Sequence, residues 1–121
     1  MNSKHAFVVY AGANETGRVF HALTHARQAH SRKDGSAVLF FAAEGTCWPE
    51  ALANDAHPMH SLYAGLLAAG VIQGACENCA IAFGHEKSAR AACGLVRGGD
   101  ESNGQIDILG LEDEGYRVWL F

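Results

Sequence analysis

The chain has 121 residues and a net charge of −4, with 49% apolar and 18% charged residues, which suits one globular domain over residues 1–121. Its nine Lys and Arg form no run or stripe, so neither nucleic acid nor an anionic membrane surface is expected as a partner. No apolar run reaches membrane-spanning length and no signal-peptide pattern precedes the first strand, so we expect a cytoplasmic protein with four reduced cysteines.

The first half of the chain alternates strand and helix signals. Residues 7–11 predict a first strand, and Asn14 is placed to cap a helix that reaches about residue 33. Residues 37–42 are continuously apolar, which is typical of a strand covered on both faces in a parallel sheet. Residues 44–57 then predict a loop that is long enough to act as a lid or to contact a partner.

The second half of the chain continues this alternation. Pro58 suits the first turn of a helix over residues 59–69, whose apolar character on both sides predicts cover from elsewhere, including a second subunit. Residues 71–75 predict the third strand. A helix over residues 78–92 follows, and Gly84 is placed to split it into two pieces.

The last quarter predicts two short strands around one helix. Residues 94–97 form the fourth strand, and Ser102 followed three residues later by Gln105 is a capping-box pattern for a helix ending near residue 115. Residues 106–109 also fit a strand. Residues 117–121 predict the last strand, and five strands alternating with helices indicate an α/β fold with a mainly parallel sheet.

The most informative motif is Cys76-Glu77-Asn78-Cys79, directly after the third predicted strand. Ligands of open parallel sheets bind beyond the carboxyl ends of the strands, and the free N–H groups of a helix starting there would stabilise a thiolate. Such a thiolate can take up sulfane sulfur as a persulfide. Glu77 opposes a very acidic thiol, because its negative charge disfavours a second one nearby. The alternative is a pair of buried structural thiols.

Metal binding and redox catalysis fit the motif less well. The motif supplies two of the four ligands that zinc requires, but no second pair lies at a typical spacing, although Cys47, Cys93, His57 and His60 are available. We therefore expect no metal site. Thioredoxin-like chemistry is disfavoured because no proline follows Pro58.

Other motifs point to ordinary structural roles. Residues 12–19 link a strand to a helix but lack the Lys and Ser/Thr of a phosphate-binding loop, so at most a small anion would rest on their amides. His21 and His25 lie one helical turn apart, where a solvated pair is favoured over a metal site. No G-x-S-x-G nucleophile motif is present in the sequence, which disfavours a hydrolase.

Residues 75–84, together with residues 40–45 and 114–121, resemble the corresponding segments of the DsrE/DsrF-like family, and the likeness covers nearly the whole chain. The resemblance implies a three-layer α/β/α domain of flavodoxin-like appearance with a mainly parallel five-stranded sheet. It also implies small homo- or hetero-oligomers such as trimers and hexamers, of which we expect a homo-oligomer here, and a role in intracellular sulfur relay or oxidation. In sulfur-relay relatives the persulfide cysteine lies eight residues before a glycine, and Cys76 has this spacing to Gly84.

The first hypothesis is a cytoplasmic sulfur carrier or sulfurtransferase-like protein. Cys76 would accept sulfane sulfur, and Cys79 would resolve the persulfide or modulate it. The partners would be sulfur donor and acceptor proteins or small thiols, and we expect no cofactor. The residues assigned to a pocket or to anion stabilisation are Asn78, Asn14, Gly45 and Trp48.

The second hypothesis is a non-catalytic oligomeric binding module. Its cysteines would be structural or redox-sensing, and a pocket under residues 44–57 would bind a small ligand or a partner peptide. The two hypotheses differ in thiol reactivity, because a carrier needs at least one accessible thiol of low pKa.

Overall fold

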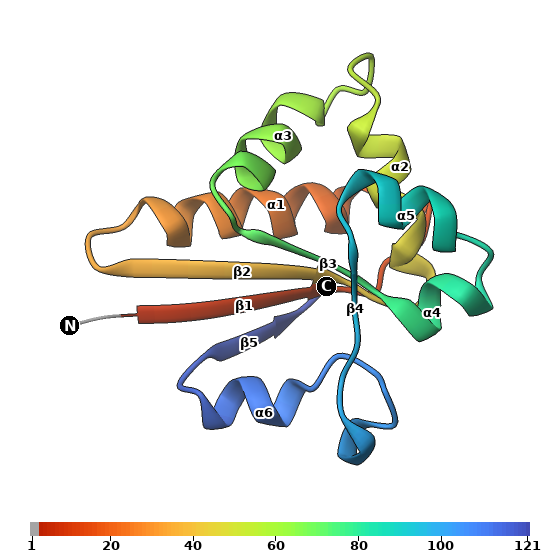
Figure 1. Cartoon of the computed structure of the whole chain (residues 1–121). Coiled ribbons are helices and arrows are strands. Elements are labelled where there is room, and N and C mark those ends of the chain that lie inside the picture. Colours follow the sequence, from red (N-terminus) through yellow and green to blue (C-terminus); the bar gives the residue numbers. More distant parts are fainter. Residues whose placement is uncertain (1–2) are drawn as a thin grey trace.

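The computed structural model describes residues 3–121, which form one five-stranded sheet of order β4-β3-β2-β1-β5 (Figure 1). Every neighbouring pair of strands is parallel, so the expected α/β fold is confirmed. The strands are β1 (Ser3–Val9), β2 (Gly35–Phe41), β3 (Ile72–Cys76), β4 (Leu95–Val96) and β5 (Arg117–Leu120).

The helices form two unequal layers on the sheet (Figure 1). The chain adds β2, β3 and β4 in one direction across the sheet, so right-handed crossovers put their connecting helices on one face. It then returns past β1 to add β5, and this connection lies on the opposite face. The first layer contains α1 (Thr16–Ser31), α2 (Trp48–Ala53), α3 (His60–Ala68) and α5 (Glu86–Ala92).

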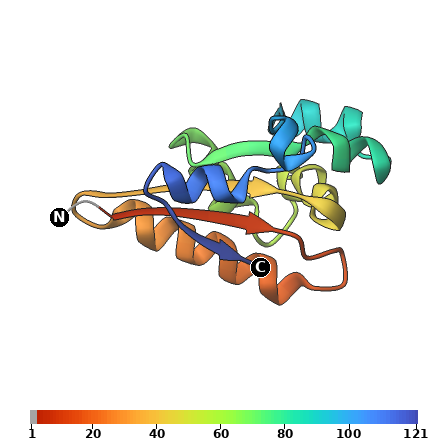
Figure 2. The ribbon, with the colours of Figure 1, turned by 90° about the horizontal axis from the view of Figure 1, so that it is seen from below.

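The opposite face is covered by one short helix, α6 (Ile108–Asp113), which lies over the sheet when the molecule is viewed from below (Figure 2). The fold is thus a three-layer α/β/α sandwich of flavodoxin-like appearance with one thin layer. None of the helices in the described part of the chain combines the length and the apolar character needed to cross a membrane.

The strands bury side chains on both faces of the sheet. Phe7 and Val9 of β1 pack into the larger core beneath α1, whereas Val8 joins a smaller cluster on the α6 side. Leu39 and Phe41 of β2 are fully buried in the larger core. Burying each such side chain contributes about 2 kcal/mol, and this two-sided burial explains the continuous apolar run at residues 37–42.

The expected helix over residues 78–92 is split, as its glycine predicted. One piece, α4 (Glu77–Ala82), ends before Gly84, and α5 begins after it. Gly84 has a φ of 79°, a left-handed conformation that ends a helix and that glycine adopts without a Cβ clash. The break turns the chain so that α4 stays at the end of β3 while α5 packs on the sheet.

The prediction of a loop over residues 44–57 is wrong. A 3-10 turn, η1 (Ala43–Cys47), leads directly into α2, and this segment buries Trp48, Pro49 and Leu52. The indole Nε1–H of Trp48 donates to the carbonyl of Ala11 at 2.9 Å. The segment is therefore part of the core, because its apolar residues outweigh the loop-forming character of their neighbours.

Asn14 does not cap the first helix, contrary to the prediction. Asn14 is exposed, and α1 begins at Thr16 without a side-chain cap. The carboxylate of Glu15 instead accepts from the backbone N–H of Gly12 at 3.1 Å, and its second oxygen lies 3.4 Å from the guanidinium of Arg18. The longer Glu15 side chain closes the turn that Asn14 was expected to close.

The capping box predicted before the last helix is also wrong. Ser102 Oγ donates to the carbonyl of Gln105 at 2.9 Å, and the Gln105 N–H donates to the Ser102 carbonyl at 3.0 Å, which closes a turn. Asn103 and Gly104 take left-handed φ values of 54° and 76°. These values stop a helix, so α6 starts only after Asp107, whose carboxylate caps it; residues 106–109 therefore do not form a strand either.

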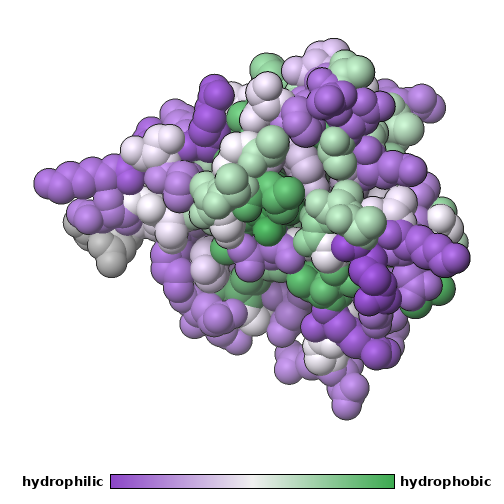
Figure 3. All heavy atoms as spheres, turned by 45° about the horizontal axis from the view of Figure 1, so that its top comes forward, coloured by the Kyte–Doolittle hydropathy of each residue, from purple (hydrophilic) through white to green (hydrophobic). Residues whose placement is uncertain are grey.

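Several large apolar side chains remain exposed on the single chain. The face seen in Figure 3 carries apolar areas surrounded by polar surface. On α3, Tyr63 and Leu66 are buried, whereas Leu67 is 39% exposed. A single copy of the chain therefore covers this helix on one side only. The other large exposed apolar residues are Phe20, Ile81, Phe83, Leu109, Trp119 and Leu120.

Gly45 allows η1 to approach the end of β1, and its replacement tests this packing. A Cβ at Gly45 would collide with the backbone carbonyl of Val9, which cannot move without disturbing the sheet. We expect Gly45→Ala to lower the free energy of unfolding by about 3 kcal/mol in a denaturant titration. The control is Gly65→Ala in α3, where the added methyl meets nothing within 4 Å. This control should raise stability by about 0.5–1 kcal/mol, and equal effects at both sites would contradict the packing.

Candidate functional site

The Cys-x-x-Cys motif lies where the connections of two neighbouring strands leave the sheet in opposite directions. The chain after β3 continues through α4 to α5 on one face, whereas the chain after β4 passes through a 3-10 turn, η2 (Asp100–Ser102), to α6 on the other (Figure 1). Such a reversal opens a crevice at the carboxyl ends of the strands, which is where open α/β sheets bind ligands. Cys76 ends β3 and therefore stands at this crevice.

Cys76 and Cys79 are held together by the start of α4. Cys76 is the residue before the helix, and its Sγ accepts the backbone N–H of Cys79 at 3.4 Å. Cys76 has no exposed surface and Cys79 is 8% exposed. The motif thus brings both thiols to one point, below the surface of the molecule.

Gln105 covers both thiols, and the sequence did not identify it as a site residue. The Cys79 Sγ–H donates to Gln105 Oε1 at 3.0 Å and the Cys76 Sγ–H donates to the same oxygen at 3.5 Å. Gln105 itself is exposed and comes from the loop between β4 and α6. Its position three residues after Ser102 predicted a helix cap instead. A contact between this glutamine and thiols 26 or more residues away leaves no local signal in the sequence.

The loop that carries Gln105 is closed by its own hydrogen bonds. The N–H of Gly98 donates to the carbonyl of Gly104 at 3.1 Å, and the N–H of Gly104 donates to that of Gly99 at 3.0 Å. A Cβ at Gly98 would collide with the Gln105 carbonyl, so only glycine permits this close approach. The backbone of the loop therefore sets the position of the amide over the thiols.

Burial controls the ionisation of Cys76. The pKa of the Cys76 thiol is raised from 9.0 to about 11. Desolvation is the largest cause and the neighbouring Cys79 thiol adds to it, whereas the backbone N–H groups of Cys79 and Asn78 oppose it. The expected amide stabilisation is present, but burial is the larger effect. The thiol is therefore protonated at neutral pH in this conformation, and the low pKa expected of a carrier cysteine is not found.

Tyr10 is a second neighbour that the sequence did not identify. Burial raises the pKa of its phenol, and the nearby Cys79 and Cys76 add to the shift, because a second negative charge beside them is unfavourable. Tyr10 packs against the buried cluster that contains both cysteines. The end of β1 thus contributes an aromatic wall to the thiol site.

Asn78 borders a polar pocket beside the thiols. Its Nδ2 donates to the carbonyl of Asn103 at 3.4 Å, so the predicted residue does lie at the site. The pocket has a volume of about 380 Å³, and Arg97 and Gly98 at the end of β4 also line it. A guanidinium nitrogen of Arg97 lies 3.7 Å from a carboxylate oxygen of Glu77. Arg97 therefore offsets the negative charge that Glu77 brings to the motif.

Asn14, Gly45 and Trp48 do not line this polar pocket. Asn14 is exposed in the connection between β1 and α1. Gly45 and Trp48 are buried in the core under the carboxyl end of β1, where the indole bonds the Ala11 carbonyl. Gly45 and Trp48 were expected to border a pocket under the loop predicted at residues 44–57, but this segment is folded into the core.

The remaining cysteines and the histidines near α3 have other partners. Burial raises the pKa of Cys93 to about 11, and burial also raises that of Cys47. His57 Nδ1 accepts the Met59 N–H at 3.1 Å, and His60 Nδ1–H donates to a backbone carbonyl of α2 at 2.8 Å. Within residues 3–121, no group of three or more His, Cys, Asp or Glu side chains is arranged to hold a metal ion.

No protein-family model, curated protein or solved structure matches the chain. The chemistry of the site is therefore inferred from its own geometry. Two thiols that share one acceptor are placed to pass sulfur to each other, or to form a disulfide when an oxidant takes up the two electrons that this step releases. The polar pocket beside Asn78 supplies room for a small molecule.

The raised pKa of Cys76 predicts the pH dependence of its alkylation. Because only the thiolate reacts, the iodoacetamide rate at Cys76 in the folded protein should rise about tenfold per pH unit from pH 8 to pH 10. The measurement is peptide mass spectrometry after timed quenching. The same chain in urea should level off above about pH 9, because its thiols have the unperturbed pKa. A native rate that levels off there would contradict the burial effect.

Removing the Gln105 amide should make both thiols more reactive. Gln105→Ala takes away the acceptor that favours the protonated form and opens the crevice, so we expect alkylation at Cys79 and Cys76 to rise several-fold at pH 8. The matched control is Gln73→Ala, because Gln73 is also exposed but bonds only the backbone around Gly70. Equal rates in the two variants would show that Gln105 does not protect the thiols.

Proposed function

We propose that this protein is a cytoplasmic sulfur carrier of the DsrE/DsrF-like type, which holds sulfane sulfur as a persulfide on Cys76. The observation that carries the proposal is that both thiols donate a hydrogen bond to Gln105 Oε1, Cys79 Sγ at 3.0 Å and Cys76 Sγ at 3.5 Å. The pair lies at the carboxyl end of β3, where open α/β sheets take up ligands. Gln105, the shared hydrogen-bond acceptor of the two thiols, is itself exposed.

Sulfur uptake needs one substitution at sulfur. The Cys76 thiol gives its proton to solvent, and its Sγ attacks the outer sulfur of a donor persulfide. A new S–S bond forms on Cys76 while the donor's S–S bond breaks, and the donor leaves as a thiolate. An acceptor thiolate that attacks the same outer sulfur reverses the process and returns Cys76 as a thiolate. No oxidant or reductant is consumed in either direction.

Cys79 supplies a second outcome for the bound sulfur. Its thiolate attacks Cys76 Sγ, a Cys76–Cys79 disulfide forms, and the outer sulfur leaves as hydrosulfide. The short helix start between the two residues keeps them within reach for this step. Cys79 would thereby empty a carrier that meets no acceptor.

The covered, high-pKa thiol favours a slow carrier over a turnover enzyme. With a pKa of about 11 for Cys76, the thiolate fraction near pH 7 is on the order of one in ten thousand. Exposed side chains change rotamer within nanoseconds, so Gln105 uncovers the thiols often. Arg97, whose side chain is 68% exposed, offers a positive charge to an anionic donor. Reaction then depends on the rare encounter of thiolate and donor.

The proposed partners are sulfur donor and acceptor proteins or small thiols. Homo-oligomers such as trimers or hexamers are part of the same proposal. Exposed apolar side chains support association, and Leu109 of α6 and Leu120 of β5 are 61% and 57% exposed. The polar pocket beside Asn78 is where a donor's sulfur would enter.

The burial of Cys76 favours a second candidate, a binding module with redox-sensing cysteines. A protonated, covered thiol resists sulfur donors, yet a strong oxidant that reaches Cys79 would still join the two sulfurs. The disulfide would remove both hydrogen bonds to Gln105 and free its loop. This candidate requires no persulfide at any stage.

Intact-mass measurement after incubation with inorganic polysulfide separates the two candidates. A carrier gains about 32 Da for each sulfane sulfur, the gain disappears in Cys76→Ser, and it accumulates in Cys79→Ser because the resolving thiol is gone. Cys93→Ser is the matched control and should behave like the native chain.

Absence of this gain from both the native protein and Cys79→Ser would refute the carrier. A loss of about 2 Da with peroxide, reversed by a reductant and absent from both single variants, would instead support the redox-sensing module.

A further inference from the structure

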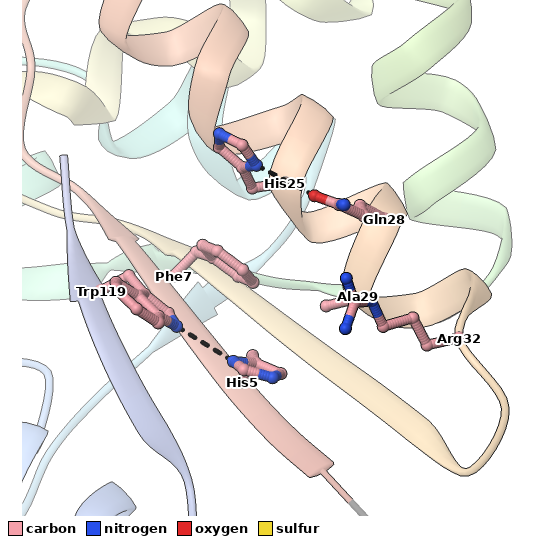
Figure 4. Close-up of a pocket in the computed structure, with 7 residues that line it drawn as sticks. All are labelled: His5, Phe7, His25, Gln28, Ala29, Arg32 and Trp119. Atoms are coloured by element: carbon pink, nitrogen blue, oxygen red, sulfur yellow. Dashed lines mark hydrogen bonds between the residues drawn. The ribbon is translucent and has the colours of Figure 1, made fainter.

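A second pocket lies far from the thiols, on the other side of the sheet. It has a volume of about 190 Å³ and lies between α1 and the strands β1 and β5 (Figure 4). Phe7 of β1 belongs to the core on the α1 side, whereas Cys76 belongs to the cluster on the α6 side. The pocket lies at the edge of the sheet, because β5 is an edge strand. The proposed sulfur chemistry makes no use of this pocket.

Aromatic rings form the strand side of the pocket. His5 stacks on Trp119 with ring centroids 6.2 Å apart and planes 23° apart, and His5 stacks on Phe7 at 6.3 Å and 29°. Trp119 is 45% exposed as a residue, so part of its surface is free. Offset parallel rings at these distances attract a further planar ring.

Hydrogen-bond donors surround these rings. The indole Nε1–H of Trp119 donates to His5 Nδ1 at 3.0 Å, so a neutral His5 carries its proton on Nε2 (Figure 4). His25 Nδ1 lies 3.2 Å from Gln28 Oε1, and a proton shared there leaves the Gln28 amide nitrogen as a donor. Burial and the nearby charges of Arg117 and Arg32 lower the pKa of His5, which keeps its ring neutral at neutral pH.

The pocket is positively charged in a protein of net charge −4. The guanidinium of Arg32 extends from the end of α1 over the pocket (Figure 4). Among the residues that the structure describes, Arg32 has no ion-pair partner, and no Asp or Glu lines the pocket. The charge is therefore available to a ligand, and a guanidinium pairs best with a planar carboxylate.

We propose that this pocket binds a small aromatic carboxylate, with the carboxylate on Arg32 and a single ring against Trp119. A cavity of about 150 Å³ accepts benzene, so the observed volume accommodates one ring but not a fused ring system. His5 Nε2–H and the Gln28 amide are the neutral donors that complete the carboxylate contacts. An aliphatic acid would use the charge but not the ring surface, and a neutral aromatic would use the rings but leave Arg32 unpaired.

The test is a titration with benzoate followed by ¹H–¹⁵N NMR at neutral pH. The chain has two tryptophans, and only Trp119 lines the pocket, so its indole N–H should shift saturably. The indole of Trp48, buried and bonded to Ala11, should not move and serves as an internal control. Benzamide and cyclohexanecarboxylate should each bind at least about fivefold more weakly, because each lacks one of the two interactions.

Two exposed arginines of the α1 segment give a matched pair of variants. Arg32→Gln should weaken benzoate binding at least about tenfold, whereas Arg27→Gln should leave it unchanged, because Arg27 does not line this pocket. Both residues are exposed, so neither change should unfold the protein. The proposal is overturned if benzoate fails to shift the Trp119 indole, if benzamide binds as well as benzoate, or if the two variants bind alike.

Discussion

The return of the chain past β1 after four strands is the constraint on which the other features depend. Because parallel strands are joined by right-handed crossovers, successive strands in one direction place their helices on one face. Only the reversal brings α6 to the other face. It also sends the connections after β3 and β4 to opposite faces of the sheet, at the end where the thiols lie. It leaves β5 as an edge strand. Both pockets discussed above therefore follow from one choice of strand order.

Two opposing effects act on the thiol at the end of β3. The amides of α4 favour the thiolate, and burial between the sheet and the Gln105 loop favours the thiol. Burial decides the balance, because the pKa of the Cys76 thiol is raised to about 11 despite the nearby amides. A reactive form must therefore admit water or a donor first, and the single covering side chain is the least costly part of the site to move.

The strand pattern was predictable because both-sided burial leaves a continuous apolar run, as at residues 37–42. The position of Cys76 at a strand end and the break at Gly84 were predictable for similar local reasons. Gln105 was not, because its contact to the thiols spans 26 residues or more. Asn14 and Trp48 were misassigned for a related reason: a turn residue and a loop residue look functional until the core around them is known.

The shortness of β4 has a consequence for how the molecule opens. Only Leu95 and Val96 pair with β3, at the outer edge of the sheet. Such an edge exchanges its amide hydrogens through local opening that costs far less than global unfolding. Arg97 and the Gln105 loop follow directly in the chain, so they would move away together with it. We therefore expect this edge to open locally while the rest of the sheet stays intact, which would bring the thiols closer to solvent.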